Sequence, residues 1–131
     1  ALLPYGACRL CVVEVQAGES FVVPPDYGHL QINPSPEPLV FSYAVRDGMK
    51  GHYDAFKSRR GAVYYEMANG PERHVFNHRY GARLPLRLLR AVDLRQFPEI
   101  SGKVTYQFIR DRLPQFEFLT DPTVFPAAAG L

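Results

Sequence analysis

Residues 18–33 read GESFVVPPDYGHLQIN, and this stretch decides the predicted fold. A short apolar segment runs into Pro24-Pro25, a turn over residues 26–28 follows, and alternating polar and apolar residues begin at His29. Prolines and a glycine fix such a corner because each restricts or permits particular backbone angles. The stretch therefore predicts two strands, at residues 20–23 and 29–33, joined by a rigid turn.

His29 is the candidate metal ligand of this stretch. Successive residues of a strand point to opposite faces, so His29, Gln31 and Asn33 share one face and the apolar residues between them share the other. If the polar face lines a barrel, His29 points inward, where a neutral imidazole is a natural ligand for a divalent metal. The alternative is a surface hairpin with an ordinary histidine, and the spacing leaves both interpretations open.

The rest of the chain predicts further short strands and little helix. Turn signals at Asn69-Gly70-Pro71 predict a hairpin between two of these strands. Short helical turns are expected within residues 52–60 and 116–119. From residue 77 onward the pattern is irregular. The predicted strands beyond the first stretch cover residues 9–15, 39–46, 62–67 and 73–76, of which 39–46 has the strongest pattern.

Composition limits the class of protein. A chain of 131 residues, 47% hydrophobic and 21% charged, suits one globular domain, and its 12 prolines, 8 tyrosines and 9 phenylalanines favour strands and turns over long helices. A net charge of +2 is too small to argue for nucleic-acid binding. No apolar run has the length of a membrane span, and the start of the chain has no signal-peptide pattern, which predicts a cytoplasmic protein with no membrane partner.

Other chemistry-bearing residues allow two interpretations each. Cys8 and Cys11 form a Cys-x-x-Cys pair, but without a second pair two reduced thiols are expected rather than a zinc or redox site. Lys57, Arg59 and Arg60 would suit a phosphate, although a solvated basic turn is the commoner explanation of such a run.

The pattern Gly-x-x-x-x-Val-Pro-Pro-x-x-x-His-x-x-x-Asn at residues 18–33 resembles the second signature of the cupin superfamily. The resemblance is closest to the cupin-type glucose-6-phosphate isomerases of archaea and some bacteria. Segments similar to that family follow in the same order, so that the resemblance covers most of residues 11–125. These segments are 34–41, 57–66, 77–87 and 118–122.

The resemblance implies a metal-dependent isomerase that interconverts glucose 6-phosphate and fructose 6-phosphate. In the family, a His-x-His pair, a glutamate and the histidine of the Pro-Pro-x-x-x-His motif hold the metal, and only His29 maps onto this chain. The other ligands should precede residue 1. Since a strand is predicted close to Ala1, a chain cut upstream is expected. The implied cofactor is a divalent ion (Fe, Mn, Ni or Zn), bound only if those ligands are supplied.

His52 and Tyr53 are the candidate catalytic residues. The family often carries Gly-His-Asp-Tyr or Gly-Asp-Tyr near the substrate, and this chain has Gly51-His52-Tyr53-Asp54, a change of order by one residue. His52 would move a proton at a ring oxygen or hydrogen-bond a sugar hydroxyl. A solvated loop histidine is the alternative.

We therefore predict an all-β fold: a cupin-like (jelly-roll) β-barrel or its C-terminal half over residues 1–76, with an irregular C-terminal arm over residues 77–131 that packs on the barrel or on a partner subunit. The expected partners are a phosphorylated sugar and a second copy of the chain in a homodimer. The alternative functions are a non-catalytic cupin-like sugar-binding or regulatory module and a dimerisation module.

Overall fold

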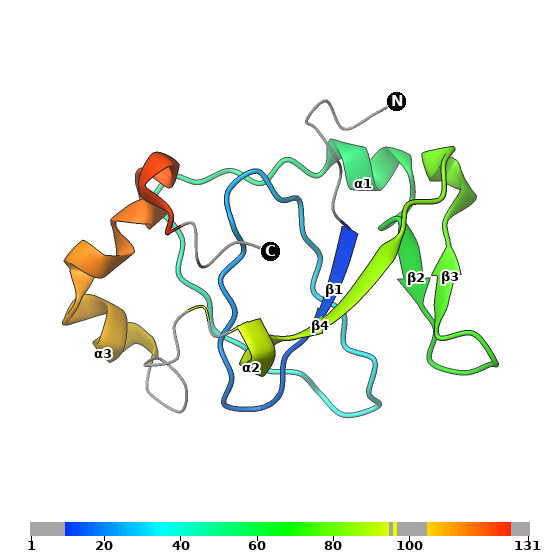
Figure 1. Ribbon diagram of the computed structural model, residues 1–131, viewed down its shortest axis with the longest axis horizontal. Coiled ribbons are helices and arrows are strands. Elements are labelled where there is room, and N and C mark those ends of the chain that lie inside the picture. Colours follow the sequence, from blue (N-terminus) through cyan, green and yellow to red (C-terminus); the bar gives the residue numbers. More distant parts are fainter. Residues whose placement is uncertain (1–9, 95, 97–104, 127–131) are drawn as a thin grey trace. The chain divides into compact units, whose positions relative to one another are not determined.

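A computed structural model of the chain describes residues 10–94, 96 and 105–126 (Figure 1). The described elements are short strands and short helices. In chain order they are β1 (Leu10–Glu14), α1 (Asp54–Ser58), β2 (Tyr64–Glu66), β3 (His74–Phe76), the 3-10 helix η1 (His78–Tyr80), β4 (Leu86–Arg90), α2 (Ala91–Leu94), α3 (Thr105–Arg110), and the 3-10 helices η3 (Leu113–Leu119) and η4 (Pro122–Val124).

The chain divides into two compact units, each made of segments that are separate in the sequence. The first unit contains residues 30–41 and 50–85. The second unit contains residues 11–29 and 42–49 together with the described residues from 86 onward. The predicted domain boundary between residues 76 and 77 stays a prediction.

A β-hairpin forms the centre of the first unit. β2 and β3 pair antiparallel with Tyr64 opposite Phe76 and Glu66 opposite His74. The predicted turn at Asn69-Gly70-Pro71 joins them, and Gly70 has φ 112°, which glycine adopts without steric cost. The rings of Tyr64 and Phe76 meet edge to face with centroids 5.6 Å apart. The predicted hairpin and the predicted helical turn within residues 52–60 are therefore confirmed.

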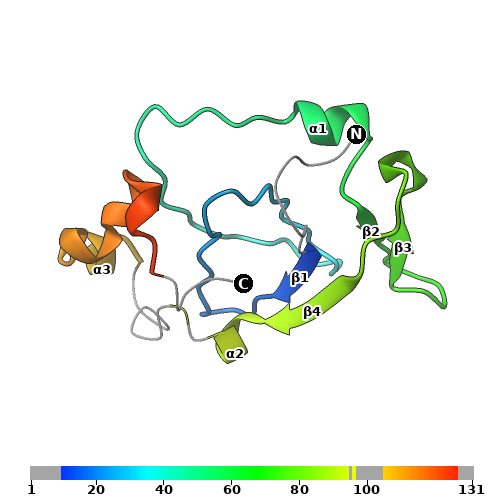
Figure 2. The ribbon, with the colours of Figure 1, turned by 45° about the horizontal axis from the view of Figure 1, so that its top comes forward.

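The second unit combines a two-stranded sheet with a helical core. β1 lies beside β4, as Figures 1 and 2 both show. Phe108, Phe116 and Phe118 form a buried cluster, against which the side chain of Val22 packs. The side-chain amide of Gln96 accepts a hydrogen bond from the Val22 N–H and donates one to the Val22 carbonyl, at 2.9 and 3.0 Å. The unit thus joins the segment before Pro24 to the C-terminal helices.

The all-β prediction holds only in part, because helices accompany the strands and the described residues form no closed barrel. The predicted strands at residues 20–23, 29–33 and 39–46 do not form. A strand needs a neighbour for its backbone hydrogen bonds, and residues 28–50 are exposed throughout, with Val40 at 92% and Tyr43 at 75%. Pro34, Pro36 and Pro38 also remove backbone donors there.

The C-terminal part has more regular structure than predicted. β4, α2, α3, η3 and η4 all follow residue 77, in a region predicted to be irregular. Only the helical turn within residues 116–119 was predicted there, and η3 confirms it. The packing of this part on a barrel or on a partner subunit stays a prediction. In the portion of the chain that the structure describes, every helix is too short or too polar to span a bilayer.

Asp121 supplies a testable pH dependence at the start of η4. Its Oδ1 accepts hydrogen bonds from the Thr123 hydroxyl at 2.6 Å and the Thr123 N–H at 3.0 Å, and these bonds lower the pKa of the carboxyl. A lowered folded pKa stabilises the fold above the unfolded pKa of about 3.9, and that contribution is lost as pH falls through the folded value. Thr123→Val is expected to raise the pKa of Asp121, measured by carboxyl NMR titration. An unchanged pKa would contradict this assignment.

Candidate functional site

The turn before His29 belongs to the second unit. Pro24 is buried, and Asp26 has φ 68°, a left-handed conformation that aspartate tolerates because its short side chain can hydrogen-bond locally. His29 follows the turn with its side chain exposed. The prediction that His29 opens a strand is wrong, since the backbone from residue 29 to 33 is irregular. Its imidazole is nevertheless open to a ligand.

A protein metal site needs several ligands, and His29 supplies one. Nowhere in residues 10–94, 96 and 105–126 do three His, Cys, Asp or Glu side chains gather closely enough to hold a metal ion. Cys11 is a free thiol, and Cys8 lies outside the described residues. The described residues therefore do not fit a metal ion by themselves.

Gly51, His52 and Tyr53 lie in the first unit immediately before α1. His52 and Tyr53 are exposed. The ring of Tyr53 folds back over Gly51, where an added Cβ would lie 2.5 Å from the ring. The Lys57 ammonium lies 5.8 Å from the centroid of the same ring, within cation–π range. The structure thus gives Tyr53 a defined orientation, with a positive charge beside it. His29 belongs to the second unit, whereas His52 and Tyr53 belong to the first.

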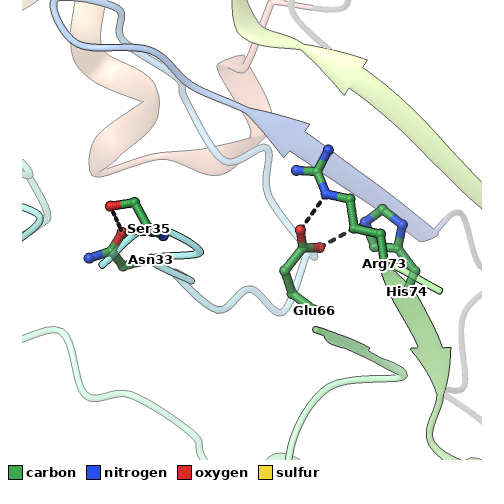
Figure 3. A network of polar contacts seen from close by, with 5 residues as sticks. All are labelled: Asn33, Ser35, Glu66, Arg73 and His74. Carbon is green, nitrogen blue, oxygen red and sulfur yellow. Dashed lines mark hydrogen bonds and ion pairs between the residues drawn. The ribbon is translucent and has the colours of Figure 1, made fainter. Parts of the chain in front are cut away.

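The Glu66 carboxylate contacts two basic side chains across the hairpin, Arg73 just before β3 and His74 in β3, as Figure 3 shows. That carboxylate lies 2.5 Å from Arg73 Nε and 2.8 Å from His74 Nε2, and the Glu66 side chain is only 7% exposed. The His74 contact has an ion-pair distance but not the angles of a hydrogen bond, so among the described residues Nε2 has no hydrogen-bond partner. This contact is therefore a close approach of His74 Nε2 to the carboxylate and not a hydrogen bond. The group fixes the hairpin register.

Asn33 and Ser35, also drawn in Figure 3, make an exposed local turn. The Ser35 hydroxyl donates to Asn33 Oδ1 at 3.0 Å, and Asn33 Nδ2 donates to the Glu37 carbonyl. These bonds satisfy polar groups between prolines that cannot donate. The turn is thus held by an exposed asparagine whose amide is open to water.

A buried asparagine, Asn77, connects residues 59–62 to the start of η1 in the first unit. Asn77 is 3% exposed, and its Nδ2 donates to the carbonyls of Arg59 and Ala62, both at 2.9 Å. Its Oδ1 accepts a hydrogen bond from the Arg79 N–H at 3.1 Å, which caps η1. One amide side chain therefore bonds to the backbone of both Arg59 and Arg79, which are twenty residues apart in sequence. We call Arg59, Arg60 and Arg79 the arginine cluster.

Tyr80 also links residues 59–61 to the segment that contains Asn77. Its hydroxyl donates to the Gly61 carbonyl at 2.8 Å, and the Arg59 guanidinium lies 5.0 Å from the centroid of its ring. Burial raises the pKa of Tyr80, and the positive charge of Arg59 offsets part of that rise. The phenol therefore keeps its proton at neutral pH and remains a hydrogen-bond donor.

Sequence reasoning selected the basic run at residues 57–60 but missed the residues that position it. Asn77 precedes a short helical turn, which is a capping signal that could have been used. Nothing in the sequence indicated that Glu66 and Tyr80 would be partly or mostly buried with specific partners, because those contacts depend on which segments fold together. His74 and His78 do not share a helix face: His74 lies in β3 and His78 in η1, with the His78 ring against Phe76.

A sequence model of the family described as glucose-6-phosphate isomerase (GPI) matches residues 6–83. The matched region is more than half of the chain and includes His29, His52, Tyr53 and the arginine cluster. No curated protein and no solved structure gives a significant match.

Proposed function

Because the chain belongs to the glucose-6-phosphate isomerase family, in its cupin type, we propose that it forms part of a metal-dependent isomerase that interconverts glucose 6-phosphate and fructose 6-phosphate. The observation that carries the proposal is the family match over residues 6–83, which contains all three candidate site residues. The homodimer and the cytoplasmic location stay predictions from the sequence.

In this proposal His29 contributes one metal ligand. Its exposed imidazole follows a turn that Pro24 and Asp26 hold in a defined conformation, which supports a ligand on a fixed backbone. Tight binding needs further ligands from outside the described residues, since one histidine binds a divalent ion weakly.

His52 and Tyr53 are the proposed substrate-facing residues. An exposed imidazole is suited to accept and return a proton at a sugar oxygen. The ring of Tyr53, folded over Gly51 and next to the Lys57 ammonium, would form a wall for the sugar. Both residues are accessible, as this role requires.

The test is an isomerase assay on metal-stripped protein with and without Fe²⁺, Mn²⁺, Ni²⁺ or Zn²⁺, for the 131-residue chain and for the full reading frame that encodes it. We expect metal-dependent conversion of glucose 6-phosphate and an activity loss of about 10- to 100-fold in His29→Ala, on the scale of disrupted metal sites. Gln31→Ala changes an exposed polar residue in the same segment and should keep its activity.

Two results would overturn the isomerase proposal: absence of activity in both forms with every metal, or equal activity in His29→Ala and the unsubstituted protein. The first result together with sugar-phosphate binding would favour a non-catalytic cupin-like sugar-binding module. A dimer that binds neither sugar phosphate nor metal would favour a dimerisation module.

A further inference from the structure

Arg60 stands where the backbone favours glycine. At the end of α1 the Gly61 N–H donates to the Phe56 carbonyl at 2.9 Å and the Arg60 N–H to the Lys57 carbonyl at 3.1 Å. This pair of bonds is the Schellman arrangement, which places Arg60 at the left-handed position that usually holds glycine. Arg60 has φ 54°. Such conformations cost a residue with a Cβ free energy and concentrate at functional positions.

Three features hold this backbone in place. The Tyr65 hydroxyl donates to the Arg60 carbonyl at 3.1 Å, the Tyr80 hydroxyl donates to the Gly61 carbonyl, and Asn77 connects Arg59 to Arg79. Each of these hydrogen bonds involves a backbone atom of residues 59–61 or of Arg79. The bonds satisfy backbone carbonyls of the turn and leave the guanidinium groups of Arg60 and Arg79 out of this network.

Two arginines of the cluster, Arg60 and Arg79, have no counter-charge among the described side chains. Arg60 and Arg79 are exposed, and no acidic side chain among the described residues lies within ion-pair distance of either. By contrast, Arg73, Arg90 and Arg110 each pair with a carboxylate. Two unpaired guanidinium groups on a fixed backbone are a recognition element for a phosphate dianion, because each can make bidentate bonds to its oxygens.

We propose that Arg60 and Arg79, the two exposed members of the arginine cluster around the buried Asn77, bind the phosphate group of a phosphorylated sugar. The identity of the sugar rests on the proposed function, whereas the anion site rests on the cluster. α1 separates the cluster from His52 and Tyr53, and its five residues rise by about 7.5 Å. That length is on the scale of a hexose phosphate, so a sugar held by its phosphate at the cluster would extend toward His52 and Tyr53.

The critical variant is Arg60→Gly. Glycine removes the charge and adopts φ 54° without strain, so the protein should unfold at the same or a higher urea concentration than the unsubstituted chain. A weaker affinity in this variant therefore reports loss of the guanidinium and not loss of the fold. Arg79→Gln removes the second charge, and Arg46→Gln removes an exposed arginine of the second unit as a control for net charge.

Calorimetric titrations with inorganic phosphate, glucose 6-phosphate and unphosphorylated glucose test the proposal on the 131-residue chain. We expect both phosphate-bearing ligands to bind, with affinity falling as salt rises, and glucose to bind far more weakly. Arg60→Gly and Arg79→Gln should each weaken phosphate and glucose 6-phosphate binding by about 10- to 100-fold, as expected for lost bonds to a charged group. Arg46→Gln should bind as the unsubstituted protein does.

The proposal is overturned if neither phosphate ligand binds, if Arg60→Gly and Arg79→Gln bind glucose 6-phosphate unchanged, or if Arg46→Gln weakens binding equally. These outcomes are separate from those of the isomerase assay. Phosphate binding that depends on the cluster, without isomerase activity, would support the anion site and refute the proposed reaction. Isomerase activity with an unchanged KM for glucose 6-phosphate in Arg60→Gly would support the proposed reaction and refute the anion site.

Discussion

Replacing Asn77 with alanine is expected to lower the free energy of unfolding by about 2–4 kcal/mol. The side chain is 3% exposed and makes three hydrogen bonds, to the carbonyls of Arg59 and Ala62 and from the N–H of Arg79. Alanine removes all three bonds, leaves backbone groups unsatisfied in a region that excludes water, and removes the cap of η1. Urea unfolding followed by circular dichroism measures the change.

Two variants separate the reasons for this loss. Asn33→Ala removes an amide that also bonds to a neighbouring carbonyl, but Asn33 is exposed, so water replaces its partners and the expected cost is below about 1 kcal/mol. Asn77→Asp keeps the shape and the acceptor but turns a carboxylate oxygen toward the carbonyls of Arg59 and Ala62. It should destabilise at least as much as Asn77→Ala. Equal stabilities of Asn77→Ala and Asn33→Ala would contradict a special role for the buried amide.

The elements that could be predicted from the sequence are those whose partners are close in the chain. The hairpin of β2 and β3 needs only the turn at Asn69-Gly70-Pro71 and two short β-forming segments, and α1 needs only local bonds. The segment 39–46 has the strongest strand pattern but forms no strand. Its pattern describes what the side chains favour, whereas a strand also requires a partner strand, and residues 28–50 are exposed and form no strand.

The same distinction applies to the candidate site. His29, His52 and Tyr53 could be selected because a sequence motif marks them, and the family match covers all three. The environment of the arginines could not be predicted, because Asn77 and Tyr80 reach Arg59 and Gly61 only after residues 59–62 and 77–80 come together. Residue type shows that a guanidinium is present, but its usefulness for binding depends on which carbonyls fix its backbone and whether a carboxylate neutralises it.

Replacing Phe116 with alanine is expected to have the largest effect on stability, about 3–5 kcal/mol, the usual cost of removing a buried phenylalanine. Phe116 is 4% exposed and lies between two other buried rings, with centroids 6.0 Å from Phe108 and 5.8 Å from Phe118. Loss of the central ring removes apolar burial and both ring contacts, and leaves a cavity between side chains that cannot approach one another fully. The change is measured by urea unfolding.

Leu113→Ala is the matched control in the same 3-10 helix, because Leu113 is 62% exposed and its truncation should change stability by no more than about 0.5 kcal/mol. Phe116→Leu tests the cavity explanation, since a smaller apolar side chain refills part of the space and should recover part of the loss. If Phe116→Ala costs no more than Leu113→Ala, the three rings do not form the core of the second unit.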